Sequence, residues 1–108
     1  MKNEKRGFDR GYTMLYVTIS DGKRFLKEFV LNASSGGLMI QSTEVWESGV
    51  ILDLIIHANV PIITKGKVTW IRHEENTYTM VIEFEDISSA ATAWWADLLE
   101  NFYTKKNE

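Results

Sequence analysis

The sequence contains no cysteine and a single proline, Pro61. The lack of cysteine excludes a disulfide framework, thiolate catalysis and a zinc site built on sulfur. Long apolar runs are also missing, because residues 50–56, one of the longest, are interrupted by Asp53 and fall far short of the roughly 20 residues of a membrane span. The charged N-terminus has no apolar run behind it, as a signal peptide would. We therefore expect a soluble cytoplasmic protein without membrane insertion.

An excess of basic residues is missing as well, since the formal net charge is −3. This balance argues against general, salt-driven binding to DNA or RNA, which usually needs a basic face. Positive charge gathers only near the N-terminus. The first ten residues contain four cations (Lys2, Lys5, Arg6 and Arg10) and two anions (Glu4 and Asp9), so the basic character is confined to a short leader.

Histidine is scarce too, and the two present, His57 and His73, fall in different predicted hairpins. A metal site or a nucleophile paired with a base therefore has little support. Glu74 and Glu75, which follow His73, are typical of an exposed turn, and Asp53 is interpreted as an outward-facing strand residue. We expect a binding protein and not an enzyme, with no resident cofactor or metal.

The sequence does contain a series of short strand patterns. With 108 residues, 44% of them hydrophobic, the chain can form one domain with its own core. Alternating apolar residues and intervening turns predict strands at 15–19, 25–31, from 38, 50–56, 62–71 and 78–84. The strand at 50–56 is expected to be buried on most of its surface. The inward side chains expected in the last two strands are Val68 with Trp70, and Tyr78, Met80 and Ile82 with Phe84. This pattern predicts a mainly β fold, a small antiparallel barrel or sandwich.

A helical period replaces the strand pattern near the C-terminus. One helical face carries the apolar residues Ala91, Trp94, Trp95, Leu98, Leu99 and Phe102. Ser88 or Ser89 is a suitable N-cap, and two lysines complement the helix dipole at the other end. We expect an amphipathic helix that closes one end of the barrel or packs on a partner. Because neighbouring tryptophans lie about 100° apart on a helix, one of Trp94 and Trp95 can stay exposed and mark a partner or homodimer surface.

Two short polar motifs stand out against these elements. The leader contains Arg6 and Arg10 in an R-x-x-x-R spacing, and the predicted loop at 32–37 contains N-x-S-x-x-G. The two guanidinium groups can bind phosphate bidentately, pair with guanine or stack on a purine face. The loop adds an amide, a hydroxyl and glycine backbone that can turn N–H groups toward an anion. Together these groups suit a compact ligand that carries both phosphate and guanine.

The first predicted hairpin brings the two motifs together. Asp21-Gly22 is a strong turn signal, and if it centres the hairpin, paired residue numbers sum to about 43. Arg10 then lies opposite Ala33. A turn that extends into Lys23 and Arg24 shifts this register by about two residues, but the leader still lies beside the loop.

The two motifs, in this order and one hairpin apart, resemble the signature of PilZ domains, the bacterial receptors for cyclic di-GMP. Gly66-x-Val68-x-Trp70 and the aromatic-rich strand that ends at Phe84 are weaker features that are also similar. The resemblance runs from about Lys5 to Phe84, with a C-terminal helix of the kind that the family often carries. It implies a six-stranded antiparallel PilZ-like β-barrel at 12–86, between a flexible leader at 1–11 and an α-helix at 87–105, all in one domain over 1–108.

Residue by residue, the resemblance implies a cyclic di-GMP site. Arg6 and Arg10 would contact the phosphates and guanine faces, and Asn32 and Ser34 would hydrogen-bond a guanine or the adjoining phosphate. Gly37 would allow the loop its close approach. The secondary candidates are Lys5, Ser35 and Gly36. The family pattern accepts asparagine or aspartate at the first loop position, but Asn32 lacks the carboxylate that can accept from guanine N1–H and N2–H together, which lowers the expected affinity.

The resemblance implies ordering coupled to binding. Ligand phosphates would draw Arg6 and Arg10 across the barrel rim, order the leader and change the surface offered to another protein. We expect a stand-alone bacterial receptor or adaptor that relays cyclic di-GMP to an unidentified partner. The first alternative is a PilZ-like protein interaction module that does not bind nucleotide. The second is a small barrel that binds single-stranded nucleic acid through aromatics and cations, which the acidic remainder of the chain disfavours.

Overall fold

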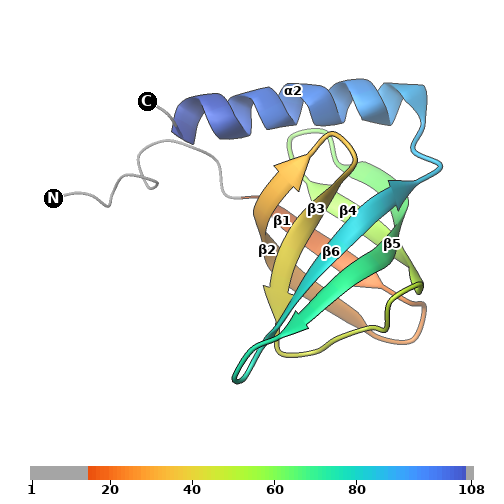
Figure 1. Cartoon of the computed structure of the whole chain (residues 1–108). Helices are drawn as coiled ribbons and strands as arrows, with labels where there is room; N and C mark the ends of the chain where they lie inside the picture. The colour runs from red at the N-terminus through yellow and green to blue at the C-terminus, as the bar shows by residue number, and fades with distance from the viewer. Residues whose placement is uncertain (1–14, 107–108) are drawn as a thin grey trace, which may run out of the picture.

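The structure, a computed structural model, describes residues 15–106 and contains a closed barrel with a helix across one end (Figure 1). Its elements are β1 (Tyr16–Ser20), β2 (Phe25–Ser34), β3 (Gly37–Ser42), β4 (Ile51–His57), β5 (Ile62–His73), β6 (Tyr78–Glu85) and α2 (Ser89–Lys106). The strand order is β1-β2-β3-β6-β5-β4, and every neighbouring pair is antiparallel. The six-stranded antiparallel barrel with a C-terminal helix is therefore confirmed. Closure pairs every strand of the sheet on both sides.

The core forms because strands send alternate side chains inward. In β4, Leu52, Leu54 and Ile56 are buried, and the residues between them are not fully covered. The expectation that this strand is buried on most of its surface is wrong, because the outer face of the barrel wall meets solvent. Asp53 faces outward, as expected, and its Oδ1 accepts a hydrogen bond from Lys65 Nζ at 2.6 Å.

A bulge in β5 changes the inward set expected for this strand. The register with β6 shifts between Val68 and Trp70, so that Val68 pairs with Ile82 and Trp70 pairs with Val81. Val68 is fully buried, but Trp70 is 45% exposed, and its expected inward position is wrong. One extra residue in a strand sends the side chains that follow to the other face.

The prediction for β6 is correct at its centre. Met80 and Ile82 are fully buried, whereas Tyr78 and Phe84 at the strand ends are only partly covered.

The β1–β2 turn contains four residues, from Asp21 to Arg24. Ser20 pairs with Phe25, so paired residue numbers sum to 45, not 43, and the register extended into Lys23 and Arg24 is the correct one. Asp21 sets this length because its Oδ1 accepts the backbone N–H groups of Lys23 at 2.8 Å and Arg24 at 3.0 Å. Gly22 has φ +93°, a conformation that glycine adopts without strain.

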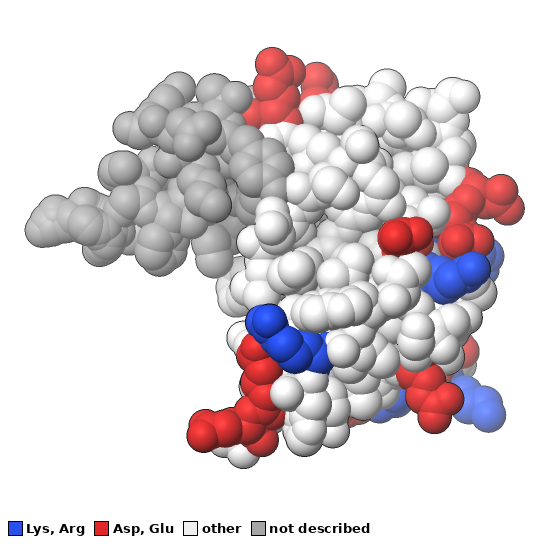
Figure 2. Space-filling view, viewed as in Figure 1, with Lys and Arg blue, Asp and Glu red and all other residues white. Residues whose placement is uncertain are grey.

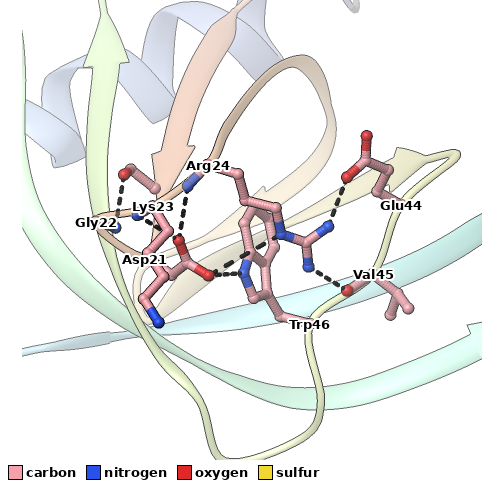
Figure 3. Close-up of polar contacts among 8 residues, drawn as sticks. Asp21, Gly22, Lys23, Arg24, Glu44, Val45 and Trp46 are labelled. Atoms are coloured by element: carbon pink, nitrogen blue, oxygen red, sulfur yellow. Dashed lines mark hydrogen bonds and ion pairs between the residues drawn. The ribbon is translucent and has the colours of Figure 1, made fainter.

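The same aspartate ties this turn to the loop between β3 and β4 (Figure 3). Asp21 Oδ2 accepts the indole N–H of the buried Trp46 at 2.9 Å, and the Arg24 guanidinium lies 4.4 Å from the centre of the Trp46 ring. Arg24 also donates to Glu44 Oε1 at 2.5 Å and to the Val45 carbonyl at 2.8 Å. The backbone N–H of Arg24, the indole N–H of Trp46 and the backbone N–H of Lys23 hold the pKa of Asp21 far below its ordinary value.

The helix packs on the barrel through one of its two tryptophans. The Ala91 N–H donates to Ser88 Oγ at 3.0 Å, so Ser88 is the N-cap and Ser89 is not. Trp95 is 1% exposed, which removes it from the candidate partner surface, and Trp94 is 46% exposed, as expected for one member of the pair. In the described residues, α2 lacks the apolar length that a bilayer crossing needs.

We expect Asp21→Asn to destabilise the fold at pH 7 and to do so less as the pH falls. The pKa of Asp21 is lowered in the folded chain, so its charge contributes stability above the unfolded pKa of about 3.9, and this contribution is lost as the pH falls toward the folded pKa. Urea denaturation of both proteins between pH 7 and about pH 2 measures the difference. Asp53→Asn, in an ion pair whose side chains are 60% exposed, is the control and should change stability little at any pH. A difference for Asp21→Asn that stays constant below about pH 4 would contradict this assignment.

Candidate ligand-binding groove

The N-x-S-x-x-G residues are held by the sheet. Strand β2 continues through Asn32 to Ser34, Ser35 and Gly36 form a two-residue β2–β3 turn, and Gly37 begins β3. The predicted loop at 32–37 is therefore wrong, because the β2–β3 ladder continues almost to its end, with Asn32 paired with Met39 and Ser34 with Gly37. Sheet pairing fixes where each of these side chains points.

A second bulge turns this motif outward. The register of β2 with β3 shifts between Val30 and Asn32. Val30 is 6% exposed and faces the core, and after the shift Ala33 is the residue that packs against the core. Asn32 and Ser34 consequently project from the outer face of the barrel, where a ligand can reach them.

These residues line an open groove with a volume of about 450 Å³. Four sequence-predicted candidates, Asn32, Ser34, Gly36 and Gly37, are among its walls, and Ser35 is not. The groove is lined by Asn32, Ala33, Ser34, Gly36, Gly37, Leu38, Met39, Val81, Glu83 and Phe84. The structure thus brings the second motif together in one cavity. Arg6, Arg10 and Lys5 lie outside the described residues.

Cross-strand register builds the floor of the groove. Asn32 pairs with Met39, Met39 with Val81, and Val81 with Trp70, so these four residues form one row across β2, β3, β6 and β5. Paired residues of antiparallel strands share a face. The row runs from a polar amide over two apolar side chains to an exposed indole. Met39, Val81 and Trp70 were not identified as site residues from the sequence, because their proximity to Asn32 depends on non-local pairing.

The next row on the same outer face of the sheet supplies the charge of the groove. Ser34 pairs with Gly37, Gly37 pairs with Glu83 on β6, and Glu83 pairs with Lys67 on β5. Glu83 is the charged member of the groove lining, and this lining, all within 15–106, contains no lysine or arginine. Figure 2 shows that the middle of the face over β3 and β6 is largely uncharged, with charged side chains at its edges. A phosphate-bearing ligand would need cations from outside this lining.

Backbone and side-chain hydrogen bonds hold the β2–β3 turn. Asn32 Oδ1 accepts the Ala33 N–H at 2.9 Å, and Ser34 Oγ accepts the Gly36 N–H at 3.3 Å. The Phe84 N–H donates to the Gly36 carbonyl at 2.8 Å, and the Trp95 indole N–H donates to the Ser34 carbonyl at 2.8 Å. These hydrogen bonds connect the turn to β6 and to α2. Within residues 15–106, no three histidine, aspartate or glutamate side chains gather as a metal site would require.

Comparison with known proteins identifies a family and a fold. The family model described as PilZ domain matches residues 4–103. Among solved structures, the Bacillus subtilis inhibitor of motility (MotI/DgrA) superposes with a TM-score of 0.70 over 91% of this chain, at 21% sequence identity. The match covers 49% of that protein, so this chain spans about half of its length. No curated protein matches the chain.

We expect Gly37→Ala and Gly36→Ala to differ sharply, although the two glycines are adjacent. A Cβ on Gly37 would overlap the Ile82 carbonyl oxygen and lie 2.9 Å from Glu83 Cα, whereas a Cβ on Gly36 would meet nothing within 4 Å. Neither residue has a positive φ. Gly37→Ala should therefore cost about 1–3 kcal/mol of unfolding free energy because the backbones of β3 and β6 must separate. Gly36→Ala should stay within about 0.5 kcal/mol. Equal midpoints of chemical denaturation for the two variants would show that strand spacing does not require Gly37.

Proposed function

This chain belongs to the PilZ domain family, whose members are binding and adaptor domains that recognise cyclic di-GMP, and from this we propose that it is a cyclic di-GMP receptor. The observation that carries the proposal is the convergence of Asn32, Ser34, Gly36 and Gly37 on one groove of the outer face. An amide, a hydroxyl and exposed glycine backbone suit the guanine edges and phosphate oxygens of such a ligand.

The floor of the groove suits a purine base. Met39 and Val81 offer apolar contact to the flat faces of a base, and Trp70 extends this surface with an indole that is 45% exposed. Aromatic side chains stack on purines with favourable free energy in single-stranded nucleic-acid sites, and the same physics applies to a cyclic dinucleotide. We assign this row to one guanine of the ligand.

Phosphate recognition falls to Arg6 and Arg10 in our proposal, with Lys5 beside them. The groove lining has no cation of its own within the described residues, and the ligand carries two phosphates. The chain enters β1 next to the motif, because the Leu15 carbonyl accepts the Val30 N–H at 2.8 Å, two residues before Asn32. The described part of the chain thus begins beside the motif. Ordering of this leader by the ligand would change the surface seen by another protein.

Glu83 supplies the carboxylate that Asn32 lacks. A carboxylate can accept from guanine N1–H and N2–H together, and no adenine base presents that pair of donors. Glu83 is across β3 from Ser34, in the same groove, and Lys67 of β5 is its cross-strand neighbour on the other side. We assign it the recognition of a guanine edge, which would distinguish cyclic di-GMP from cyclic di-AMP.

The proposed output is contact with another protein. An inhibitor of motility shares this fold, but the likeness extends to about half of that protein and does not identify a pathway for this chain. Trp94, which is 46% exposed on α2, suits a protein contact, since tryptophan is enriched at interfaces. We place the receptor in the bacterial cytoplasm, where cyclic di-GMP acts, and expect no binding to DNA or RNA.

We expect Arg10→Ala to weaken cyclic di-GMP binding more than about 100-fold in isothermal titration, because it removes charge-assisted hydrogen bonds worth about 1.5–3 kcal/mol each. Lys23→Ala, which removes one exposed cation from the β1–β2 turn, is the matched control and should bind as the wild type does. GTP and cyclic di-AMP should give no saturable heat. Wild-type affinity in Arg10→Ala would refute the leader as the phosphate site, and no binding by the wild type would favour the nucleotide-independent interaction module.

We expect Glu83→Gln to lower cyclic di-GMP affinity about tenfold and to narrow the preference over cyclic di-AMP, since the amide can accept only one of the two guanine N–H groups. Glu75→Gln makes the same charge change in the β5–β6 turn and is the control. Tighter binding by Glu83→Gln would show that this carboxylate only repels the phosphates, and an unchanged affinity would place it outside the contact.

A further inference from the structure

The β2–β3 turn, which walls the groove, is held from outside the sheet by α2. The Trp95 indole N–H donates to the backbone carbonyl of Ser34, 61 residues earlier in the chain, at 2.8 Å. The Trp95 ring packs edge-on against Phe84, with ring centres 5.2 Å apart and planes at 85°. The Phe84 N–H in turn donates to the Gly36 carbonyl at 2.8 Å. Trp95, Phe84 and the turn thus form a closed ring of contacts.

This ring of contacts shares most of its members with the groove. Ser34, Gly36 and Phe84 all line the cavity, whereas Trp95 is 1% exposed and lies behind them. Trp95 can therefore act on a ligand only through the residues that it holds. Its indole has one N–H donor, and breaking this bond would leave the donor of a buried side chain without a partner, so the turn and the helix are favoured to move together.

Trp94, the neighbour of Trp95 on α2, connects these contacts to the protein surface. Trp94 is 46% exposed and Trp95 is buried, which places the two rings on different sides of α2. Successive helical residues are about 100° apart. A small slide or roll of α2 that keeps Trp95 on the Ser34 carbonyl consequently changes how Trp94 is presented. In Figure 1, α2 lies across the end of the barrel and is not part of the strand ladder.

We infer that Trp95 is a positioning residue that couples occupancy of the groove to the position of α2. The inference rests on the proposed binding of cyclic di-GMP. A ligand that engages Asn32 and Ser34 displaces the β2–β3 turn, and the hydrogen bond from Trp95 passes the displacement to the helix and to Trp94. Such coupling is reciprocal, so a partner that binds the Trp94 side of α2 changes ligand affinity.

The test follows the indole N–H signals of the ¹⁵N-labelled full chain by nuclear magnetic resonance as cyclic di-GMP is added. We expect the Trp95 and Trp94 signals to shift. The Trp46 signal should stay, because its N–H is bonded to Asp21 at the β1–β2 turn. Trp95→Phe keeps an aromatic ring but removes the donor; we expect about tenfold weaker binding and, at saturating ligand, no shift of Trp94. Trp94→Phe, the matched control on the same helix, should keep the wild-type affinity and the Trp95 shift.

The outcomes separate coupling from simple packing. A Trp94 signal that still shifts in saturated Trp95→Phe overturns the inference, because packing alone would then transmit the change. If Trp95→Phe loses its cooperative thermal transition, the test uses the wild-type protein alone. A wild-type Trp95 signal that does not shift at saturating cyclic di-GMP then overturns the inference.

Failure of the proposed function is recognised separately. If the wild type binds no cyclic di-GMP, amide exchange without ligand tests the positioning role. The Phe84 amide should then exchange faster in Trp95→Phe than in the wild type, while the Val30 amide, bonded to Leu15, stays protected. Equal Phe84 exchange in the two proteins overturns the positioning role itself.

Discussion

In a small closed barrel each side chain points either into the core or to the outside, and a bulge reverses this alternation along a strand. Two bulges set which side chains of β2 and β5 reach the outer face beside the groove. The shift after Val30 turns Asn32 and Ser34 outward, and the shift after Val68 does the same for Trp70. Without them, an unbroken alternation would carry Asn32 and Trp70 into a core already filled by fully buried aliphatic side chains. The groove is a product of these irregularities as much as of the motif that lines it.

The sequence was sufficient where the signal is local. Strand periodicity, the Asp21-Gly22 turn and the serine cap of α2 act over a few residues, and each led to the correct element. The errors arose where a distant strand decides. Nothing near Trp70 or Asn32 in the chain marks the extra residue of a bulge, because the bulge is defined by what β6 and β3 place opposite it. The same reasoning explains why the pairing of Asp21 with Trp46 was missed.

The candidate site also contains residues that the sequence identified and residues that only the strand pairing revealed. Asn32, Ser34, Gly36 and Gly37 were identified from their spacing and from a family resemblance, and they do share a cavity. Glu83 belongs to the same cavity, yet it becomes their neighbour only through the pairing of β3 with β6. The apolar residues of the floor, Met39, Val81 and Trp70, were not identified from the sequence for the same reason. A one-dimensional motif thus identified one wall of the groove, and the remainder required the register of four strands.

Gly37 belongs to the motif, but in a sequence comparison its presence indicates the spacing of the strands and not ligand binding. Its missing side chain accommodates the backbone of β6, so the barrel itself requires glycine here whether or not a nucleotide is bound. A related chain that had abandoned the ligand would be under pressure to keep this glycine, while its outward-facing amide and hydroxyl could drift. Retention of glycine at this point therefore reports the architecture, and under the proposed function the residues at the Asn32 and Ser34 positions are the ones that mark ligand binding.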